Sequence, residues 1–349
     1  MPIQIDNEKI ARFKQLVGES EKILILSHMN PDGDAVGSLL GMAHLLEKNI
    51  SIPEKNLFLL LPHPCPTSFH YLGGSERIVA ASVDMEACTK AFEEADLIIG
   101  VDFNSPGRTG ILGQLLEEAK QPKILIDHHH NPAIESFNLI ISYPDISSAC
   151  ELVHWVAYDA WGEDAFDFNS AQALFNGIVT DTGSFAFSNE HPSLYEAAQR
   201  LVKFPIGPAR IHNEAFNSLS VDKMRFFAYA LDKRMKIFPE EGFCYIYVSK
   251  EEFDRFGLDT NGTSGLVPYT LMMRPIHVGA LIHEEDDRVR ISFRSKNDFD
   301  VNDFARRHFE GGGHTKAAGA TSHLSFEETV SFVEKTMLDE LRRHNSNKQ

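Results

Sequence analysis

The chain has 349 residues, beyond the ~250–300 at which a single core stops growing, so we expect two domains. Its 33 Lys and Arg against 50 Asp and Glu give a formal net charge of −17. Proteins that bind long nucleic acids normally present a basic face, so this charge argues against a long polyanionic ligand. No apolar run approaches the ~18–20 residues that span a bilayer, and the four scattered cysteines match no disulfide framework or zinc ribbon. We therefore expect a cytoplasmic protein without membrane contact.

The first part of the chain alternates short apolar runs with helix-like segments. The apolar, β-type runs are 22–27, 56–61, 96–101 and 123–126. Leu39, Leu40, Ala43 and Leu46 recur at helical spacing and predict a helix over about 35–47. Nearly continuous apolar strands that alternate with helices are typical of a parallel sheet covered on both faces.

Helical patterns then dominate, over 148–161, 170–179, 192–204 and 220–234. The pattern changes beyond them to β-type runs at 243–248, 277–283 and 288–293, followed by helical segments near 301–308 and 326–342. We expect an α/β protein with a parallel-sheet catalytic domain over 1–190, a helical linker over 191–236 and a smaller α/β domain over 237–345.

Metal-ligand residue types follow the ends of several predicted elements. They are His28, Asp32, Asp34, Asp102, the run from Asp127 to His130, and Asp181. Ligands bind beyond the carboxyl ends of the strands in open α/β sheets, and Asp32 and Asp34 would project the same way from an extended loop. Repulsion among three or four carboxylates is costly unless divalent cations neutralise them.

This set of ligands favours two metal ions. Mixed carboxylate and imidazole ligands suit Mn²⁺, with Mg²⁺ or Co²⁺ as alternatives. One ion hardly requires six such ligands, whereas a pair about 3.5–4 Å apart does, and such pairs typically hydrolyse phosphate esters. Taken singly, an Asp-rich loop is more often a turn or helix cap, and a histidine run is more often surface. Their joint occurrence at the ends of predicted elements favours the metal centre.

The motifs resemble those of the DHH phosphoesterase superfamily. His28-x-Asn-Pro-Asp32-Gly-Asp34, Asp102, Asp127-His128-His129 and Asp181-Thr-Gly183 are similar to its four motifs, and Gly311-Gly-Gly-His314 resembles the glycine-rich motif of the DHH-associated C-terminal domain. The order and separation of the motifs resemble the NrnA group of nanoRNases and pAp phosphatases. The resemblance implies hydrolysis of short oligoribonucleotides and of 3′-phosphoadenosine 5′-phosphate (pAp), in a cleft between the two domains.

The resemblance also implies the role of each motif residue. One ion would be held by His28, Asp32 and Asp102, and the other by Asp34, Asp102, His128 and Asp181. Asp127 would orient a ligand histidine, and His129 would face the substrate phosphate or protonate the leaving oxygen. Outside the motifs, Arg108 follows Asp102 by six residues and would clamp the same phosphate through both guanidinium nitrogens, with an ordinary surface arginine as the alternative. His130 extends the histidine run beyond the motif and is better interpreted as exposed or helix-capping.

The C-terminal domain supplies a second recognition element. The backbone N–H groups of Gly311, Gly312 and Gly313 would converge on an anion, with His314 as a side-chain donor. Arg294 and Ser295, at the end of a predicted strand, would complete a pocket for a phosphate and a base. We expect this pocket to hold the 5′-phosphate of a short substrate.

Other functions stay open. The chain could be a phosphodiesterase of cyclic or linear dinucleotides, or a catalytically silent nucleotide- or RNA-binding module. An inorganic pyrophosphatase or polyphosphatase shares the N-terminal motifs, but the glycine-rich C-terminal motif argues against it. The expected partners are short RNA oligonucleotides and pAp-like nucleotides, and a homodimer is the assembly that the resemblance suggests.

Overall fold

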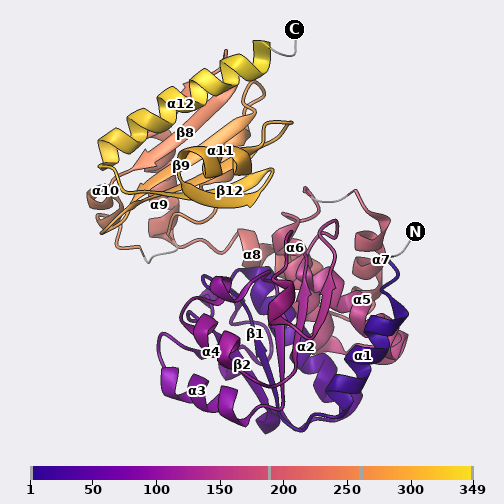
Figure 1. Cartoon of the computed structure of the whole chain (residues 1–349). Helices are drawn as coiled ribbons and strands as arrows, with labels where there is room; N and C mark the ends of the chain where they lie inside the picture. The colour runs from indigo at the N-terminus through magenta and orange to yellow at the C-terminus, as the bar shows by residue number, and fades with distance from the viewer. Residues whose placement is uncertain (1–2, 188–189, 259–261, 347–349) are drawn as a thin grey trace. The chain divides into compact units, whose positions relative to one another are not determined.

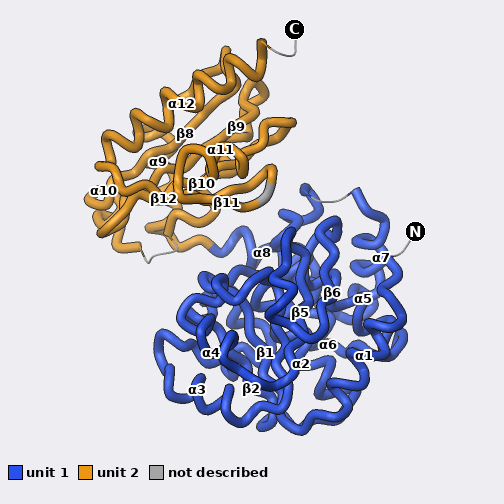
Figure 2. Tube along the Cα trace, in the orientation of Figure 1, with its two compact units in different colours: residues 1–218 blue, residues 219–349 orange. Residues whose placement is uncertain are grey.

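The computed structural model describes residues 3–187, 190–258 and 262–346 (Figure 1). The chain divides into two compact units, residues 1–218 and 219–349 (Figure 2). The segment expected as a linker contains α7 (Pro192–Leu201) and α8 (Pro208–Phe216) of the first unit and α9 (Val221–Lys233) of the second.

The first unit is built on a six-stranded parallel sheet of order β3-β2-β1-β4-β5-β6. The strands are β1 (Ile23–Leu26), β2 (Leu57–Leu61), β3 (Val79–Ala80), β4 (Leu97–Val101), β5 (Lys123–Asp127) and β6 (Leu139–Ser142). Every residue of β1, β4 and β5 is buried, as the apolar runs predicted. The sequence patterns missed β3 and β6. The strand order reverses between β1 and β4, which is where ligands bind in open α/β sheets.

Helices cover both faces of this sheet, as predicted. They are α1 (Asn7–Gly18), α2 (Gly33–Ile50), α3 (Met85–Glu94), α4 (Gly113–Glu118), α5 (Ala149–Trp161) and α6 (Phe168–Asp181). One hydrophobic cluster joins the sheet to α1, α2, α5 and α6, and another joins it to α3 and α4. A Cβ added to Gly177 of α6 would lie only 2.1 Å from the Cys150 sulfur of α5, so glycine is required where these helices meet.

The second unit is built on a mixed six-stranded sheet of order β11-β12-β10-β9-β8-β7. The strands are β7 (Met235–Phe238), β8 (Phe243–Val248), β9 (Val278–Glu284), β10 (Val289–Ser295), β11 (Glu310–His314) and β12 (Ala317–Ser322). Only β8 and β9 pair in parallel; the other pairs are antiparallel. The strand patterns predicted β8, β9 and β10 but missed β7, β11 and β12.

Helices pack on both faces of the second sheet. Besides α9, they are α10 (Lys250–Asp254), α11 (Val301–His308) and α12 (Phe326–Ser346). Residues of α11 and α12 pack against Phe243, Tyr245 and Phe293, whereas α9 packs against Ile246 and Leu281. The predicted α/β class with a smaller second domain is confirmed. None of the helices in the described part of the chain has the length and apolar character needed to cross a membrane.

Candidate metal centre

The amino end of α2 places two carboxylates in different environments. Asp32 is the N-cap residue, and its side chain accepts hydrogen bonds from the N–H groups of Asp34 (3.0 Å) and Ala35 (3.1 Å). Asp34 lies in the first turn of the helix, so the expected extended loop is wrong: capping by Asp32 starts the helix earlier than the apolar spacing suggested. The Asp32 side chain is 61% exposed, whereas Asp34 is buried.

Asp34 is held by the amino end of α5. Its carboxylate oxygens accept hydrogen bonds from the N–H groups of Ala149 (2.7 Å) and Cys150 (2.9 Å). N–H groups in the first turn of a helix have no acceptor within the helix, and the helix dipole favours a negative charge there. Burial, together with the charges of Asp102 and Asp181, nevertheless holds the pKa of Asp34 well above its ordinary value. A bound cation would relieve this repulsion.

Asp102 follows β4 and lies between two histidines. It is buried, and its backbone has a left-handed φ of 61°. One carboxylate oxygen lies 3.2 Å from His28 Nε2, and the other lies 3.5 Å from His128 Nε2. Burial alone would raise the pKa of Asp102, but hydrogen bonds and charges from both histidines lower it. A carboxylate that bridges two ions directs one oxygen toward each ion. Asp102 directs one oxygen toward His28 and the other toward His128, which are expected to bind different ions.

The contact with Asp102 also shifts the pKa of His28, which lies two residues after β1. Burial alone would lower the pKa of His28, but the hydrogen bond and charge of Asp102, helped by Asp32, raise it to about 9. Its Nδ1 lies 2.8 Å from the carbonyl oxygen of Met29, which fixes the ring so that Nε2 faces Asp102.

Side chains capable of holding a metal ion gather in three overlapping groups, and the ligand atoms of each lie within 4.8 Å of one another. The groups are His28 with Asp32 and Asp102, Asp34 with His128 and Asp181, and Asp102 with His128 and His129. The structure thus brings together all six residues that the resemblance implies as ligands. The donors are carboxylates and imidazoles, which fit Mn²⁺ or a similar divalent ion.

His129 is oriented by Asp127, the buried last residue of β5. Asp127 accepts hydrogen bonds from His129 Nδ1 (2.7 Å) and from the His129 backbone N–H (3.1 Å). The bond at Nδ1 leaves Nε2 as the ring nitrogen on the opposite side. Asp127 therefore orients His129, the histidine expected to face the phosphate. The resemblance had implied that Asp127 orients a histidine that binds an ion.

The backbone of Arg108 contacts the loop that carries His28. Its carbonyl oxygen accepts a hydrogen bond from the N–H of Met29 (2.9 Å), the residue after His28. In the described ranges, its guanidinium forms no ion pair within 4.0 Å. His130 contributes its carbonyl oxygen, which accepts a hydrogen bond from Asn104 Nδ2 (2.8 Å).

The glycine run of the second unit is a strand and not the expected anion-binding loop. Gly311, Gly312 and Gly313 belong to β11, which pairs with β12, and Gly313 N–H donates to Asn302 Oδ1 (2.9 Å). Regular antiparallel pairing spreads backbone N–H groups along the strand, so they do not converge on one anion. The backbone of His314 ends this strand, and its side chain lies outside the described residues.

Arg294 and Ser295 lie at the end of β10 in different surroundings. Arg294 is half-buried, its guanidinium donates to the Phe293 carbonyl oxygen (3.0 Å), and burial lowers its pKa. Ser295 is buried and donates to the Phe299 carbonyl oxygen (2.8 Å). Ala317 of β12 pairs with Arg294 on one side and with His314 on the other. Arg294 and the end of the glycine strand therefore lie opposite the same residue of β12.

Sequence reasoning missed the backbone donors of α5. Ser148 caps this helix by accepting from the Glu151 N–H (3.0 Å), and a serine three residues before a glutamate is a recognisable helix start. That signal locates the start of α5. It does not reveal that the backbone N–H groups of Ala149 and Cys150 contact Asp34, which lies 115 and 116 residues away in sequence.

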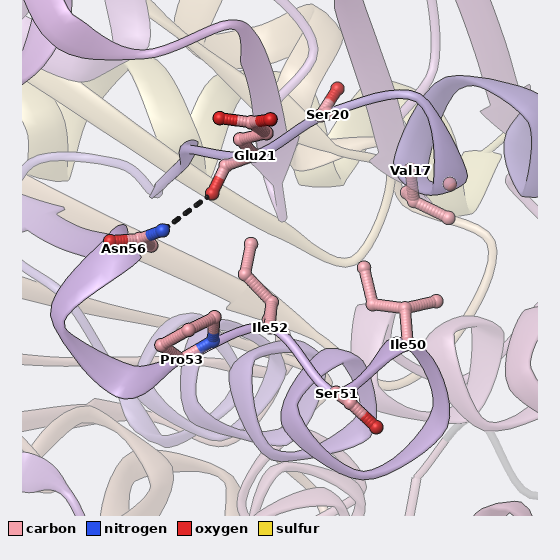
Figure 3. A pocket seen from close by; sticks show the side chains of 9 residues that line it. Val17, Ser20, Glu21, Ile50, Ser51, Ile52, Pro53 and Asn56 are labelled. Atoms are coloured by element: carbon pink, nitrogen blue, oxygen red, sulfur yellow. Dashed lines mark hydrogen bonds between the residues drawn. The ribbon is translucent and has the colours of Figure 1, made fainter.

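A hollow of about 230 Å³ lies at the other end of the first sheet (Figure 3). It is formed by residues just before β1 and β2, including Glu21, Ile52 and Asn56, and Asn56 Nδ2 donates to the Glu21 carbonyl oxygen (3.0 Å). Because β1 and β2 are parallel and begin there, this hollow and the metal-ligand groups lie at opposite strand ends.

Comparison with known proteins places the two units in known domain families. The family model of the DHH family N-terminal domain matches residues 22–178, and that of the DHHA1 domain matches residues 241–339. The chain is 28% identical over 309 residues to a Bacillus subtilis (strain 168) protein named bifunctional oligoribonuclease and PAP phosphatase NrnA, covering 86% of this chain and 89% of that protein.

Solved structures share the fold. The crystal structure of an exopolyphosphatase-related protein from Bacteroides fragilis has a TM-score of 0.91 and 28% identity, covering 97% of this chain and 98% of that one. RecJ from Thermus thermophilus, solved with Mn²⁺, has a TM-score of 0.54 and 13% identity, covering 98% of this chain and 56% of that one, which shows the fold alone. The chain belongs to the DHH family of phosphoesterases, with a DHH domain followed by a DHHA1 domain.

Proposed function

We propose that the protein hydrolyses short oligoribonucleotides to mononucleotides and pAp to AMP, using two divalent ions with Mn²⁺ preferred. The observation that carries this proposal is the buried Asp102, whose two oxygens face His28 and His128. The similarity to the Bacillus oligoribonuclease and PAP phosphatase spans most of both chains and supports the choice of substrates. The four cysteines are free, which suits the reducing cytoplasm that we propose as its location.

The residues divide into two groups of ligands. His28, Asp32 and Asp102 would hold one ion, and Asp34, His128 and Asp181 would hold the other together with Asp102. The bound ions would supply an activated water and neutralise charge on the phosphate. The N–H groups of Ala149 and Cys150 keep Asp34 in place for this role, because they fix both of its oxygens.

His129 supplies the acid–base chemistry of the chain. Asp127 accepts the Nδ1 hydrogen, so Nε2 is the ring nitrogen that would carry the proton exchanged with the substrate. That proton can be donated to the oxygen that leaves when the phosphorus–oxygen bond breaks. Arg108 would bind the same phosphate through its guanidinium.

The second unit would bind the 5′-phosphate through Arg294 and the end of β11. A short oligonucleotide and pAp both carry a 5′-phosphate near a 3′-linked phosphorus, so one anchor serves both substrates. Two bound divalent ions would raise the net charge from −17 to about −13, which is still unfavourable for long polyanions. We therefore propose a preference for substrates of a few nucleotides.

Product analysis tests this function directly. Labelled RNAs of two to 24 nucleotides, pAp and a cyclic dinucleotide are each incubated with Mn²⁺ and wild-type protein. We expect mononucleotides from the shortest RNAs and AMP from pAp, with rates that fall as the RNA lengthens. Equal rates on the longest and shortest RNA would contradict the length limit, and faster cleavage of the cyclic dinucleotide would assign the other phosphodiesterase activity.

A further inference from the structure

The segment after Asp181 has an unusual backbone. Gly183, Ser184 and Phe185 follow one another with left-handed φ values of 56°, 58° and 66°. Residues other than glycine rarely adopt this conformation, and such strain persists only where surrounding contacts enforce it. The segment begins directly after α6, whose last residue is the metal-ligand candidate Asp181.

Hydrogen bonds hold this turn in one shape. The buried Thr182 hydroxyl donates to the Ile178 carbonyl oxygen (2.6 Å) and accepts from the Phe185 N–H (2.9 Å). The Thr182 carbonyl oxygen accepts from the N–H groups of Ala186 (2.9 Å) and Phe187 (2.8 Å). The Ser184 side chain also contacts His212 of α8 through a hydrogen bond. The turn therefore fixes the backbone from which Phe187 projects.

The Phe187 ring rests on Gly183. A Cβ added to Gly183 would lie 2.6 Å from a ring carbon of Phe187, so only glycine lets the ring lie so close to the backbone. Phe187 is nevertheless 62% exposed. Single exposed apolar residues are common on protein surfaces, so exposure alone assigns no role. Phe187 differs because its ring packs on the backbone two residues from Asp181.

We propose that Phe187 is a substrate-binding residue that stacks on the base of the nucleotide whose phosphate lies near Asp181. Single-stranded nucleic acids are commonly bound by stacking unpaired bases on aromatic side chains, which tolerates every base. The inference rests on the proposed function and deepens it, because it makes the site selective for phosphates that carry a base. Purines, with the larger stacking surface, should bind more tightly than pyrimidines.

Two variants and a control test the stacking by kinetics. Phe187→Ala removes the ring, Phe187→Trp keeps an aromatic face, and Phe168→Ala removes a phenylalanine, 43% exposed, from the other end of α6. Stacking of one base typically contributes enough that its loss weakens binding by about tenfold or more. We expect Phe187→Ala to raise KM for a dinucleotide about tenfold with little change in kcat, whereas the other two variants stay near wild type.

Matched substrates separate stacking from a structural role. Two further dinucleotides each lack one of the two bases. Phe187→Ala should leave KM unchanged for the dinucleotide that lacks the stacked base, because the lost contact is already absent. An equal rise in KM for both base-deleted dinucleotides and the intact one, or no rise for any, would overturn the proposal.

A fluorescence measurement does not depend on turnover. The Phe187→Trp variant is titrated with AMP and with ribose 5-phosphate in Mg²⁺, with wild type as the baseline for the two native tryptophans. We expect AMP to quench the new tryptophan and ribose 5-phosphate to leave it unchanged. Absence of AMP quenching would overturn the stacking role. Quenching in a protein that cleaves no dinucleotide would refute the proposed function and leave the stacking role intact.

Discussion

The two units differ in how many elements build their candidate sites. In the first unit, the ends of β1, β4 and β5 and the ends of α2, α5 and α6 all contribute to one small region, where buried carboxylates contact imidazoles. In the second unit, β10, which carries Arg294, and the glycine strand β11 lie on either side of β12, near one edge of the sheet. From this difference we expect variants of the metal-ligand groups and of Asp127 in the first unit to change kcat, and variants of Arg294 in the second unit to change KM.

Replacing Asp102 with asparagine should have the largest effect. The asparagine side chain keeps the shape of Asp102 but not the negative charge that faces both His28 and His128. The two ions would therefore lose the carboxylate that bridges them. We expect kcat for a dinucleotide to fall by at least about 10³-fold, equivalent to ~4 kcal/mol. Steady-state hydrolysis in Mn²⁺ measures it, with Asp84→Asn, at the N-cap of α3, as the matched control. Substantial turnover in Asp102→Asn would contradict the ligand assignment.

Asp127→Asn should have the next largest effect. The asparagine can still occupy the space but no longer offers a carboxylate to His129 Nδ1, so the imidazole loses its charge partner and its preferred tautomer. Mutation of such an orienting partner typically costs about 10–100-fold, and we expect that loss in kcat. Calorimetric titration with Mn²⁺ should show nearly unchanged binding. If Asp127→Asn instead abolished metal binding, Asp127 would belong with the ligands.

The pH dependence of metal binding tests the paired histidine. The pKa of His28 is about 9 in the metal-free protein, because Asp102 and Asp32 outweigh the effect of burial. A ligand histidine must be neutral, so binding releases its proton, and the apparent Mn²⁺ affinity should rise by about tenfold per pH unit for each proton released. The rise attributed to His28 should level off near pH 9. Affinity that is independent of pH between 6.5 and 9 would contradict this pairing.

The same shift predicts how the metal-free protein responds to pH. A raised pKa in the folded state means that protonated His28 stabilises the fold fully below its unfolded pKa of about 6.5, and that this contribution is lost as pH rises through about 9. Thermal unfolding in a chelator should therefore show Tm falling over this range. The fall should be smaller in His28→Gln, which has no proton to lose.

Arg294→Ala should have the smallest effect and should act on KM. Removing a guanidinium that binds the 5′-phosphate would raise KM for 5′-phosphorylated dinucleotides by about tenfold, or ~1.4 kcal/mol, with kcat little changed. Dinucleotides with a 5′-hydroxyl should be unaffected, and Arg288→Ala serves as the control because Arg288 pairs with Glu285 at the opposite end of β10. Wild-type protein that cleaves both kinds of dinucleotide equally well would contradict the anchoring role.

The comparison also explains what the sequence could predict. Parallel strands with buried apolar runs bring their carboxyl ends to one edge, so Asp102 and the Asp127–His129 run could be placed together from pattern alone. The distance between α5 and Asp34 in sequence hid the backbone donors, and no periodicity signals such a contact. The glycine run was ambiguous because glycine suits both a tight anion-binding turn and a close-packed strand, and its pairing with β12 depends on tertiary structure.

Locating the metal ions tests the central claim most directly. Crystals of the protein grown with Mn²⁺ and measured at the manganese absorption edge reveal each ion by its anomalous scattering. We predict two ions about 3.5–4 Å apart, one beside His28 and Asp32 and one beside Asp34 and His128, with Asp102 contacting both. A single ion, or none at these residues, would contradict the two-metal account.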